Sequence, residues 1–227
     1  MKGRTLPGAV RSERAAAGRV VLICAIWAGV HSLLASERAK GLAVAAAGPR
    51  PRDGLYRLAY NAQSVATVAL AARWFLRLPD RELYRAGPPW SWLFRVGQVG
   101  SLAVLFSGVR VVGVLEFTGV APLRRALTGR KSRPEPEAQG PPMGADGEME
   151  AAGAFRLTRH PGNLGALGFF LLWPRMTVNR AVLAALVAVY VVLGSMHEER
   201  RLRTAYGEAY ERYRRQVPFL LPRPPRG

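Results

Sequence analysis

The stretch GNLGALGFFLLWPRMTVNRAVLAALVAVYVVLGSM, residues 162–196, holds two apolar runs joined by a short polar turn. Because the turn PRMTVNR is only a few residues long, the two runs are predicted to form a helical hairpin. The first run, Gly162–Trp173, is too short to cross a membrane at right angles. The second, Ala181–Met196, falls slightly short of the roughly 20 apolar residues that a membrane-spanning helix needs.

Three further apolar runs precede this hairpin, at Val20–Ala35, Leu55–Leu76 and Val96–Phe117. The second and third of these are long enough to span a bilayer. The runs therefore predict an all-α integral membrane protein with four or five transmembrane helices, of which five is the preferred number. The first run begins too far into the chain for a signal peptide and no small-residue cleavage site follows it, so it is predicted to be a retained helix.

The charged residues of the chain are collected into blocks between the apolar runs. The chain has 227 residues, of which 49% are hydrophobic, and its 33 Lys and Arg against 15 Asp and Glu give a net charge of +18. Such a charge fits nucleic acid or an anionic membrane surface, and the apolar runs decide for the membrane. We expect the lipid bilayer, and no nucleic acid, as a partner.

The basic blocks also predict how the chain is oriented. With five spans, the blocks in residues 38–52, 124–159 and 200–226 all fall on one side, which the positive-inside rule makes the cytoplasmic side. The N-terminal segment is basic too and falls on the opposite side, against the pattern. The prediction is an integral protein of a bacterial-type inner membrane with its site on the cytoplasmic side.

The expected organisation has three parts. Residues 1–118 form a three-helix membrane part, residues 119–153 a mobile cytoplasmic linker, and residues 154–227 a hairpin and tail that bind the cofactor. The linker is predicted because its Pro, Gly and charged residues cannot bury a core. The lone Cys24 is predicted to be a packing residue, and the spacing of the three histidines gives no metal site.

Polar residues at the start of the hairpin mark the first candidate site, in the stretch TRHPGNLG, residues 158–165. Arg159 and His160 precede Pro161, which suits the first turn of a helix because it lacks an N–H group. The free N–H groups of such a turn attract polar or anionic ligands. Gly162, Gly165 and Gly168 share a small-residue face that suits either a ligand or helix packing, and both interpretations stay open.

The second candidate lies at the end of the hairpin, where Glu198 and Glu199 are adjacent. Neighbouring helical residues point about 100° apart, so only one of them can face a given pocket. The other is expected to pair with Arg203, four residues further on. Beyond them, one helical face collects apolar and aromatic side chains, which predicts an amphipathic interfacial helix that ends at Pro218. These side chains are Leu202, Tyr206, Ala209, Tyr210 and Tyr213.

The third candidate consists of polar residues inside the N-terminal helices. They are His31, Tyr60, Asn61, Gln63, Arg110 and Glu116. Arg110 is expected about eight residues from the end of its helix, and therefore to face the protein interior or a wet cavity. For Asn61 and Gln63 the alternative is hydrogen bonding between helices. His31 and Arg110 are predicted to lie on the substrate side.

Two stretches of the chain together resemble the isoprenylcysteine carboxyl methyltransferase superfamily, which includes phospholipid methyltransferases. They are FRLTRHPGNLG at residues 155–165 and EERRLRTAYGEAYERYRRQVPFLLP at residues 198–222. The resemblance runs from about Phe155 to Pro222. RMTVNR at residues 175–180 and HSLLASERAK at residues 31–40 are most similar to its methanethiol S-methyltransferase and NnrU-type branch. Asn163 stands where the family usually has a Tyr, and Phe155 where a Tyr often precedes the motif.

The resemblance implies a membrane methyltransferase that uses S-adenosylmethionine and acts on a small thiol or an apolar, lipid-like acceptor. It implies a cofactor-binding set, while no catalytic residue is assigned. The set is Phe155, Arg159, His160, Pro161, Gly162, Asn163 and Glu198. The alternative is a non-enzymatic NnrU-type membrane protein that supports a respiratory or nitrogen-oxide pathway, and binding of the cofactor distinguishes the two.

Overall fold

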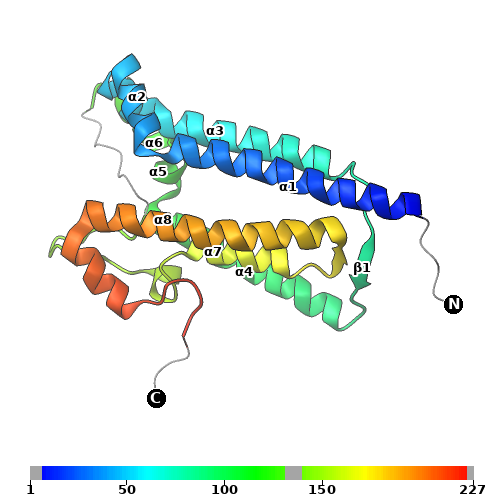
Figure 1. Ribbon diagram of the computed structural model, residues 1–227. Coiled ribbons are helices and arrows are strands. Elements are labelled where there is room, and N and C mark those ends of the chain that lie inside the picture. The colour runs from blue at the N-terminus through cyan, green and yellow to red at the C-terminus, as the bar shows by residue number, and fades with distance from the viewer. Residues whose placement is uncertain (1–6, 131–139, 224–227) are drawn as a thin grey trace.

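The computed structural model describes residues 7–130 and 140–223, and in these ranges the protein is almost entirely helical (Figure 1). Its longer helices are α1 (Pro7–Ala35), α2 (Glu37–Ala47), α3 (Pro49–Phe75), α4 (Trp90–Val112), α7 (Pro161–Leu171) and α8 (Val178–Gln216). Ser36 separates α1 from α2, because its side chain accepts a hydrogen bond from the Ala39 backbone N–H and caps the second helix. The expected all-α class is confirmed.

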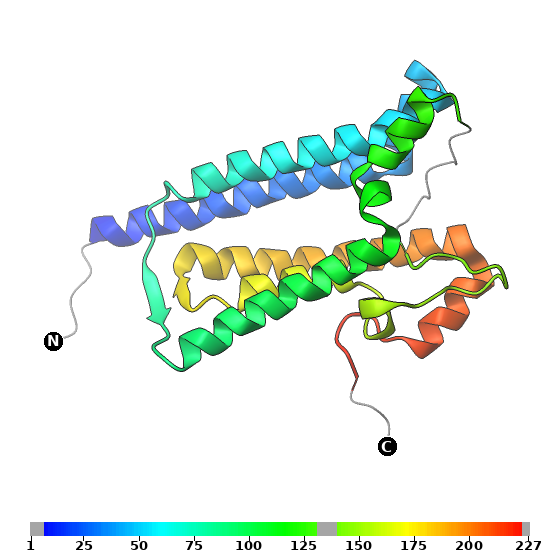
Figure 2. The same cartoon turned by 180° about the vertical axis from the view of Figure 1, so that it is seen from behind.

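The helices form two layers, which the views from front and back both show (Figures 1 and 2). α1 and α3 lie side by side in one layer, and α4, α7 and α8 make up the other. The strand β1 (Glu82–Arg85), between α3 and α4, pairs antiparallel with β2 (Arg175–Thr177) in the turn of the hairpin. The predicted hairpin is present as α7 and α8, and β1 ties its turn to the N-terminal half.

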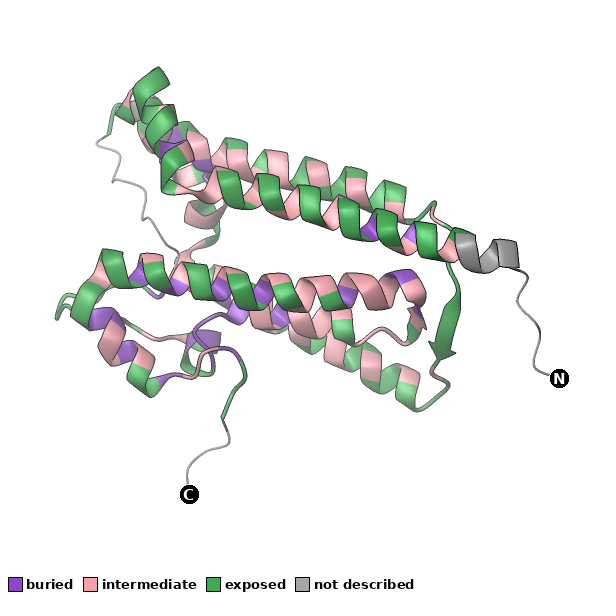
Figure 3. Ribbon diagram, in the orientation of Figure 1, coloured by how far each residue is buried: buried purple, intermediate pink, exposed green. Residues whose placement is uncertain are grey.

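Three helices in the described ranges are long and apolar enough to cross a membrane, at Ser12–Ala35, Trp90–Val112 and Val178–Gln216. The preferred number of five is not confirmed. α3 has 27 residues but carries Arg57, Asn61 and Gln63 along its length, and α7 has only 11 residues. Much of the outer surface of α1 and α3 is exposed (Figure 3), as expected for helices that meet lipid rather than protein.

The run Val96–Phe117 does not form one helix, contrary to the prediction. Gly113 has φ 94° and ψ 119°, so α4 ends at Val112 and the short α5 (Val114–Thr118) follows. Arg110 therefore lies in the last turn of α4, where its side chain is exposed. The prediction that it faces the interior is wrong, because the helix ends about one turn earlier than the apolar run does.

The segment predicted to be a mobile linker, residues 119–153, is structured wherever it is described. It begins with α6 (Val120–Leu127), which packs on α3. Met149 is only 8% exposed and packs in a cluster with Leu202, Tyr210 and Tyr213. The expectation that this segment buries no core is wrong for residues 140–153, and residues 131–139 lie outside the described residues.

The predicted amphipathic tail helix is the last part of α8. Gly207 has φ 51° and ψ −127°, which breaks the helical path and turns the remaining residues away from the helix axis (Figure 1). The apolar face of this tail is buried against Met149, Ala151 and Val217. The predicted face is therefore real, but the chain itself covers it, and its location at a membrane interface is not confirmed.

Candidate functional site

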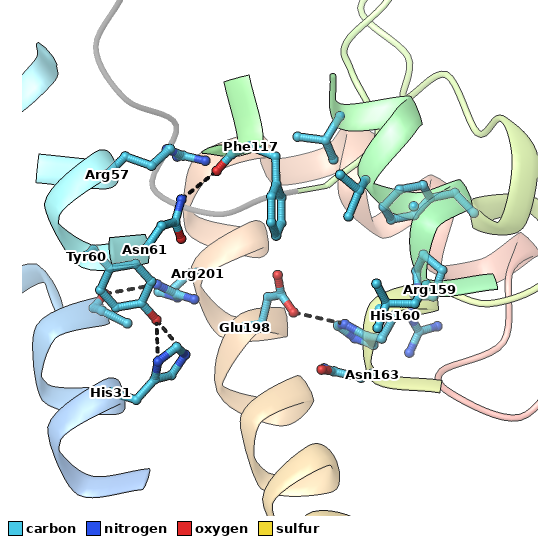
Figure 4. A pocket seen from close by; sticks show the side chains of 18 of the residues that line it. His31, Arg57, Tyr60, Asn61, Phe117, Arg159, His160, Asn163, Glu198 and Arg201 are labelled. Carbon is cyan, nitrogen blue, oxygen red and sulfur yellow. Dashed lines mark hydrogen bonds and ion pairs between the residues drawn. The ribbon is translucent and has the colours of Figure 1, made fainter. Parts of the chain in front are cut away.

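A cavity of about 430 Å³ lies between the two layers. One wall comes from α1, α2 and α3, and includes His31, Lys40 and Arg57. The opposite wall comes from α4, from α8 and from the 3₁₀ turn η1 (Gly153–Arg156) that leads into α7. The N-terminal and C-terminal parts of the chain therefore build the cavity together, and Figure 4 shows their side chains facing each other.

All seven residues of the predicted cofactor set line this cavity, namely Phe155, Arg159, His160, Pro161, Gly162, Asn163 and Glu198. Glu198 lies far from the other six residues in the sequence, and the packing of α7 against α8 brings them together. His31, predicted on the substrate side, lines the opposite wall, whereas Arg110 is not part of the lining. The lining supports one shared site for these residues, and their roles remain predictions.

Arg159 is buried, with 9% of its surface exposed, and its guanidinium is bound by the protein itself. Nε lies 2.7 Å and Nη2 3.3 Å from the two carboxylate oxygens of Glu199. Nη1 donates to the backbone carbonyls of Arg214 and Val217 at 2.9 and 2.8 Å. The guanidinium therefore ties the start of α7 to the tail of α8, and most of its donors are already used.

Glu199 is buried and does not pair with Arg203, contrary to the prediction. Its carboxylate accepts a hydrogen bond of 2.6 Å from the Tyr210 hydroxyl in addition to those from Arg159. Arg203 pairs instead with Glu211, at 3.1 Å. The turn at Gly207 brings Tyr210 back toward Glu199, a contact that the spacing along a straight helix could not predict.

His160 connects the two glutamates. Its Nδ1 lies 3.1 Å from Glu198 Oε2, and its Nε2 lies 3.2 Å from Glu199 Oε1. Burial lowers the pKa of His160, but the hydrogen bonds to Glu198 and Glu199 raise it by more, so its pKa lies above the ordinary value. As an imidazolium, the ring donates from both nitrogens and holds Glu198 at the cavity wall.

The glycines of α7 differ in their surroundings, and the packing interpretation is confirmed for two of them. A Cβ at Gly165 would collide with the backbone of Ser101 and with Leu105, and one at Gly168 would collide with the Ser101 side chain. These two glycines therefore allow α7 to pack closely on α4. Gly162 lines the cavity, and no atom lies within 4 Å of the position of its Cβ. The first turn of α7 is thus open to a ligand.

Asn163, which replaces the usual Tyr of the motif, donates a hydrogen bond of 2.8 Å from its amide to Ser195 Oγ. Phe155 is buried, and its backbone carbonyl accepts a hydrogen bond of 2.9 Å from the Tyr213 hydroxyl. Both side chains still line the cavity. Asn163 and Phe155 therefore still form part of the cavity wall, but they do not supply the hydroxyl groups that Tyr side chains would have at these two positions.

The opposite wall is organised around His31. Its Nε2 lies 2.6 Å from the Tyr60 hydroxyl, its Nδ1 lies 3.1 Å from Ser64 Oγ, and its ring stacks on Trp27. Asn61 donates to the Phe117 carbonyl at 2.8 Å, which confirms the alternative of bonding between helices. That alternative is wrong for Gln63, whose amide bonds to Thr67 within α3.

Lys40, Arg57 and Arg201 also line the cavity, although the sequence did not mark them as site residues. Lys40 lies in a basic block that was interpreted only as a signal of orientation. Arg201 could have been found from its spacing, because it follows Glu198 by three residues and shares its helical face. Arg57 could not, since only the packing of α3 brings it to the site.

Comparison with curated proteins finds relatives that match part of this chain. The chain is 40% identical over 68 residues to a methanethiol S-methyltransferase of Crocosphaera subtropica, a match that covers 30% of this chain and 27% of that protein. It is 34% identical over 82 residues to one from Pseudomonas deceptionensis, covering 36% of this chain and 31% of the relative. A third, from Mycobacterium tuberculosis, is 39% identical over 72 residues, or 32% of this chain and 30% of the relative.

Over these segments, the chain is a homologue of methanethiol S-methyltransferases. The resemblance predicted from its motifs is confirmed. The matches span about 30% of the length of these curated relatives. No family model and no solved structure matches the chain.

Proposed function

We propose that this protein is an integral membrane methyltransferase that uses S-adenosylmethionine and methylates a small thiol. The observation that carries the proposal is the similarity to several proteins named methanethiol S-methyltransferase. The cavity supports it, because the motifs behind the resemblance meet there. As the matches cover only part of each relative, the whole activity is inferred from a shared segment.

The lining fits such a cofactor in three ways. The first turn of α7, after His160, offers backbone N–H groups and an uncrowded glycine, Gly162. Glu198 presents a partly exposed carboxylate that can accept hydrogen bonds from an ammonium or from ribose hydroxyls. Leu105, Val109 and Val112 of α4 add an apolar surface. A mainly apolar pocket with a few convergent polar groups is typical of cofactor sites.

When bound, S-adenosylmethionine would supply a methyl group on a positively charged sulfonium sulfur. The acceptor thiolate must approach in line with the breaking bond, so the protein acts chiefly by positioning two reactants. Glu198, fixed by His160, would hold the cofactor at the α7–α8 wall. His31, fixed by Tyr60 and Ser64, would face the acceptor from the α1–α3 wall. The apolar residues of α4 would exclude water, which favours a reaction that neutralises charge.

The proposed site lies at one end of the helices. The C-terminal end of α1, the end of α4 and the start of α7 lie toward this end (Figure 1), near the described parts of the basic segments. We place it on the cytoplasmic side of a bacterial-type inner membrane. Reporter fusions after Arg130 and near Gly87 should report opposite sides, with the first in the cytoplasm. A shared side for both fusions would contradict this placement.

The test of the function uses the full chain, purified in detergent and mixed with methyl-labelled S-adenosylmethionine. The acceptors are methanethiol, a prenylated cysteine and phosphatidylethanolamine, and the labelled product is expected with the thiol. Glu198→Gln should weaken binding of S-adenosylhomocysteine by about tenfold or more, since a charge-assisted hydrogen bond contributes roughly 1.5–3 kcal/mol. Absence of any binding to a folded wild-type sample would reject the enzyme and favour the non-enzymatic alternative.

A further inference from the structure

Two residues of opposite charge, Glu198 and Arg201, lie three positions apart on α8 and both line the cavity. Residues at this spacing share a helical face, so their charged groups are presented to the same space. Figure 4 shows Glu198 turned toward His160 and Arg201 turned toward Tyr60, on the two sides of the site. Each is held by a different partner: Glu198 by His160, and Arg201 by the carbonyl of Ala35 at 3.1 Å.

Arg201 keeps donors for a ligand. Its Nη1 bonds to an uncharged carbonyl, and its buried Nε has no hydrogen-bond partner among the described residues. A buried donor without a partner is costly, because it loses its hydrogen bonds to water. Arg57 of α3, only 8% exposed, lines the same cavity and adds a second guanidinium. Arg201 thus offers a buried donor that the described residues leave unused.

The two cationic residues of the motif, Arg159 and His160, are engaged within the protein. Arg159 uses its guanidinium on Glu199 and on two backbone carbonyls, and both nitrogens of His160 face glutamates. Neither group can bind a ligand carboxylate without giving up a buried partner. A carboxylate in this cavity would therefore be bound more favourably by Arg201 than by Arg159 or His160.

We propose that Glu198 and Arg201 form a receptor for an α-amino acid group, with Glu198 binding the ammonium and Arg201, assisted by Arg57, binding the carboxylate. Such a group carries both charges on one carbon, which matches an acid and a base on one helical face. The inference rests on the proposed function. Two molecules offer this chemistry, the methionine part of the methyl donor and a thiol amino acid as acceptor.

The test compares three ligands that share the adenosine part of the cofactor and differ in the groups attached to its sulfur, and each variant is compared with the wild type for the same ligand. S-Adenosylhomocysteine has both the ammonium and the carboxylate, decarboxylated S-adenosylmethionine keeps only the ammonium, and 5′-methylthioadenosine has neither. Arg201→Gln should weaken binding of the first ligand by about tenfold, a factor that corresponds to 1.4 kcal/mol, and leave the other two unchanged. Glu198→Gln should weaken binding of the first two ligands and spare 5′-methylthioadenosine.

Arg200→Gln is the matched control, because Arg200 is the exposed neighbour of Arg201 on the same helix and the charge change is identical. It should leave all three dissociation constants unchanged. Arg201→Lys, which keeps the charge but loses the planar donors, should give an intermediate loss. Retained binding of 5′-methylthioadenosine shows that a variant is folded, even where the link from Arg201 to Ala35 is lost.

Steady-state kinetics with different acceptors tests whether the amino acid group belongs to a thiol amino acid acceptor instead of the methyl donor. If Arg201→Gln spares cofactor binding but raises the KM for cysteine or homocysteine and not for ethanethiol, the receptor belongs to an amino acid acceptor. If Arg201→Gln weakens all three cofactor ligands equally, or changes neither binding nor KM, the receptor does not exist. Failure of wild-type protein to bind any of the ligands would reject the proposed function instead, so the two failures are distinguishable.

Discussion

Two adjacent glutamates on α8 belong to different regions of the molecule. Glu199 is part of a buried network with Arg159, His160 and Tyr210, in which each charge has a partner inside the protein. Glu198 lines the cavity and has partly exposed oxygens. The comparison teaches that Glu199 is fully engaged in holding α7 and the tail of α8 together, whereas Glu198 bonds to His160 and keeps part of its carboxylate exposed to the cavity.

The largest effect on this difference between the two glutamates is expected when the charge of Glu199 is removed. Glu199→Gln leaves Arg159 buried without its anion, and loss of one partner of a buried ion pair costs about 3–5 kcal/mol. We expect a large fall in the unfolding temperature in detergent. Glu211→Gln, which removes a more exposed carboxylate from the same helix, is the control. A stable Glu199→Gln protein with weak ligand binding would place Glu199 in the cavity instead.

A second test separates the two kinds of glycine in α7. Gly165→Ala forces a methyl group against the backbone of Ser101 and should destabilise the protein by about 1–3 kcal/mol, as overpacking does. Gly162→Ala meets open space and should leave the unfolding temperature unchanged while it weakens cofactor binding. Thermal unfolding and ligand titration of both variants check this, and a reversed order of the two stabilities would contradict it.

A smaller effect is expected from Tyr210→Phe. The change removes one hydrogen bond to Glu199, whose carboxylate keeps its bonds to Arg159 and His160. The expected loss is about 1 kcal/mol of stability, the usual net contribution of a hydrogen bond. Chemical unfolding measures it, and Tyr206→Phe on the same helix serves as the control. An equal loss in both variants would show that the loss does not come from the hydrogen bond to Glu199.

The dependence of stability on pH should come largely from His160. Since its pKa is raised in the folded protein, its contribution is fully present below its ordinary value of 6.5 and is lost as the pH rises through the raised value. The unfolding temperature of the wild type should therefore fall as the pH rises above neutrality. His160→Gln should flatten this slope, and an unchanged slope in that variant would assign the effect to another group.

The smallest effect is expected at Arg110. It lies exposed in the last turn of α4 and outside the cavity lining, so Arg110→Gln should change stability by less than about 0.5 kcal/mol. Cofactor binding and acceptor KM should be those of the wild type. A raised KM in this variant would restore Arg110 to the substrate side, where the sequence first placed it.

The sequence predicted those parts of the site that depend on neighbouring residues. Pro161 starts a helix because of its own ring, and the adjacency of Glu198 and Glu199 forces them onto different faces, so both features follow from local geometry. The whole predicted cofactor set lines one cavity because α7 also packs against α8, which local geometry does not predict. Its assignment to a cofactor came from the resemblance and not from the spacing.

The remaining features depend on packing that no local pattern encodes. Met149 was assigned to a linker because its neighbours are polar, yet it fills the space inside the bend at Gly207. Arg57 reaches the cavity only because α3 lies beside α1 in the layer above. Arg110 was misplaced because hydropathy continues past Gly113, whereas the helix does not.

The cavity is built from both layers, and this bears on how such proteins diversify. One wall is carried by residues 31–61 and the other by helices later in the chain. A chimera that takes α1, α2 and α3 from a relative would exchange the first wall and keep α4, His160, Glu198 and Arg201. Under the roles proposed for the two walls, we expect such a chimera to change the preferred acceptor and to keep the binding of the cofactor.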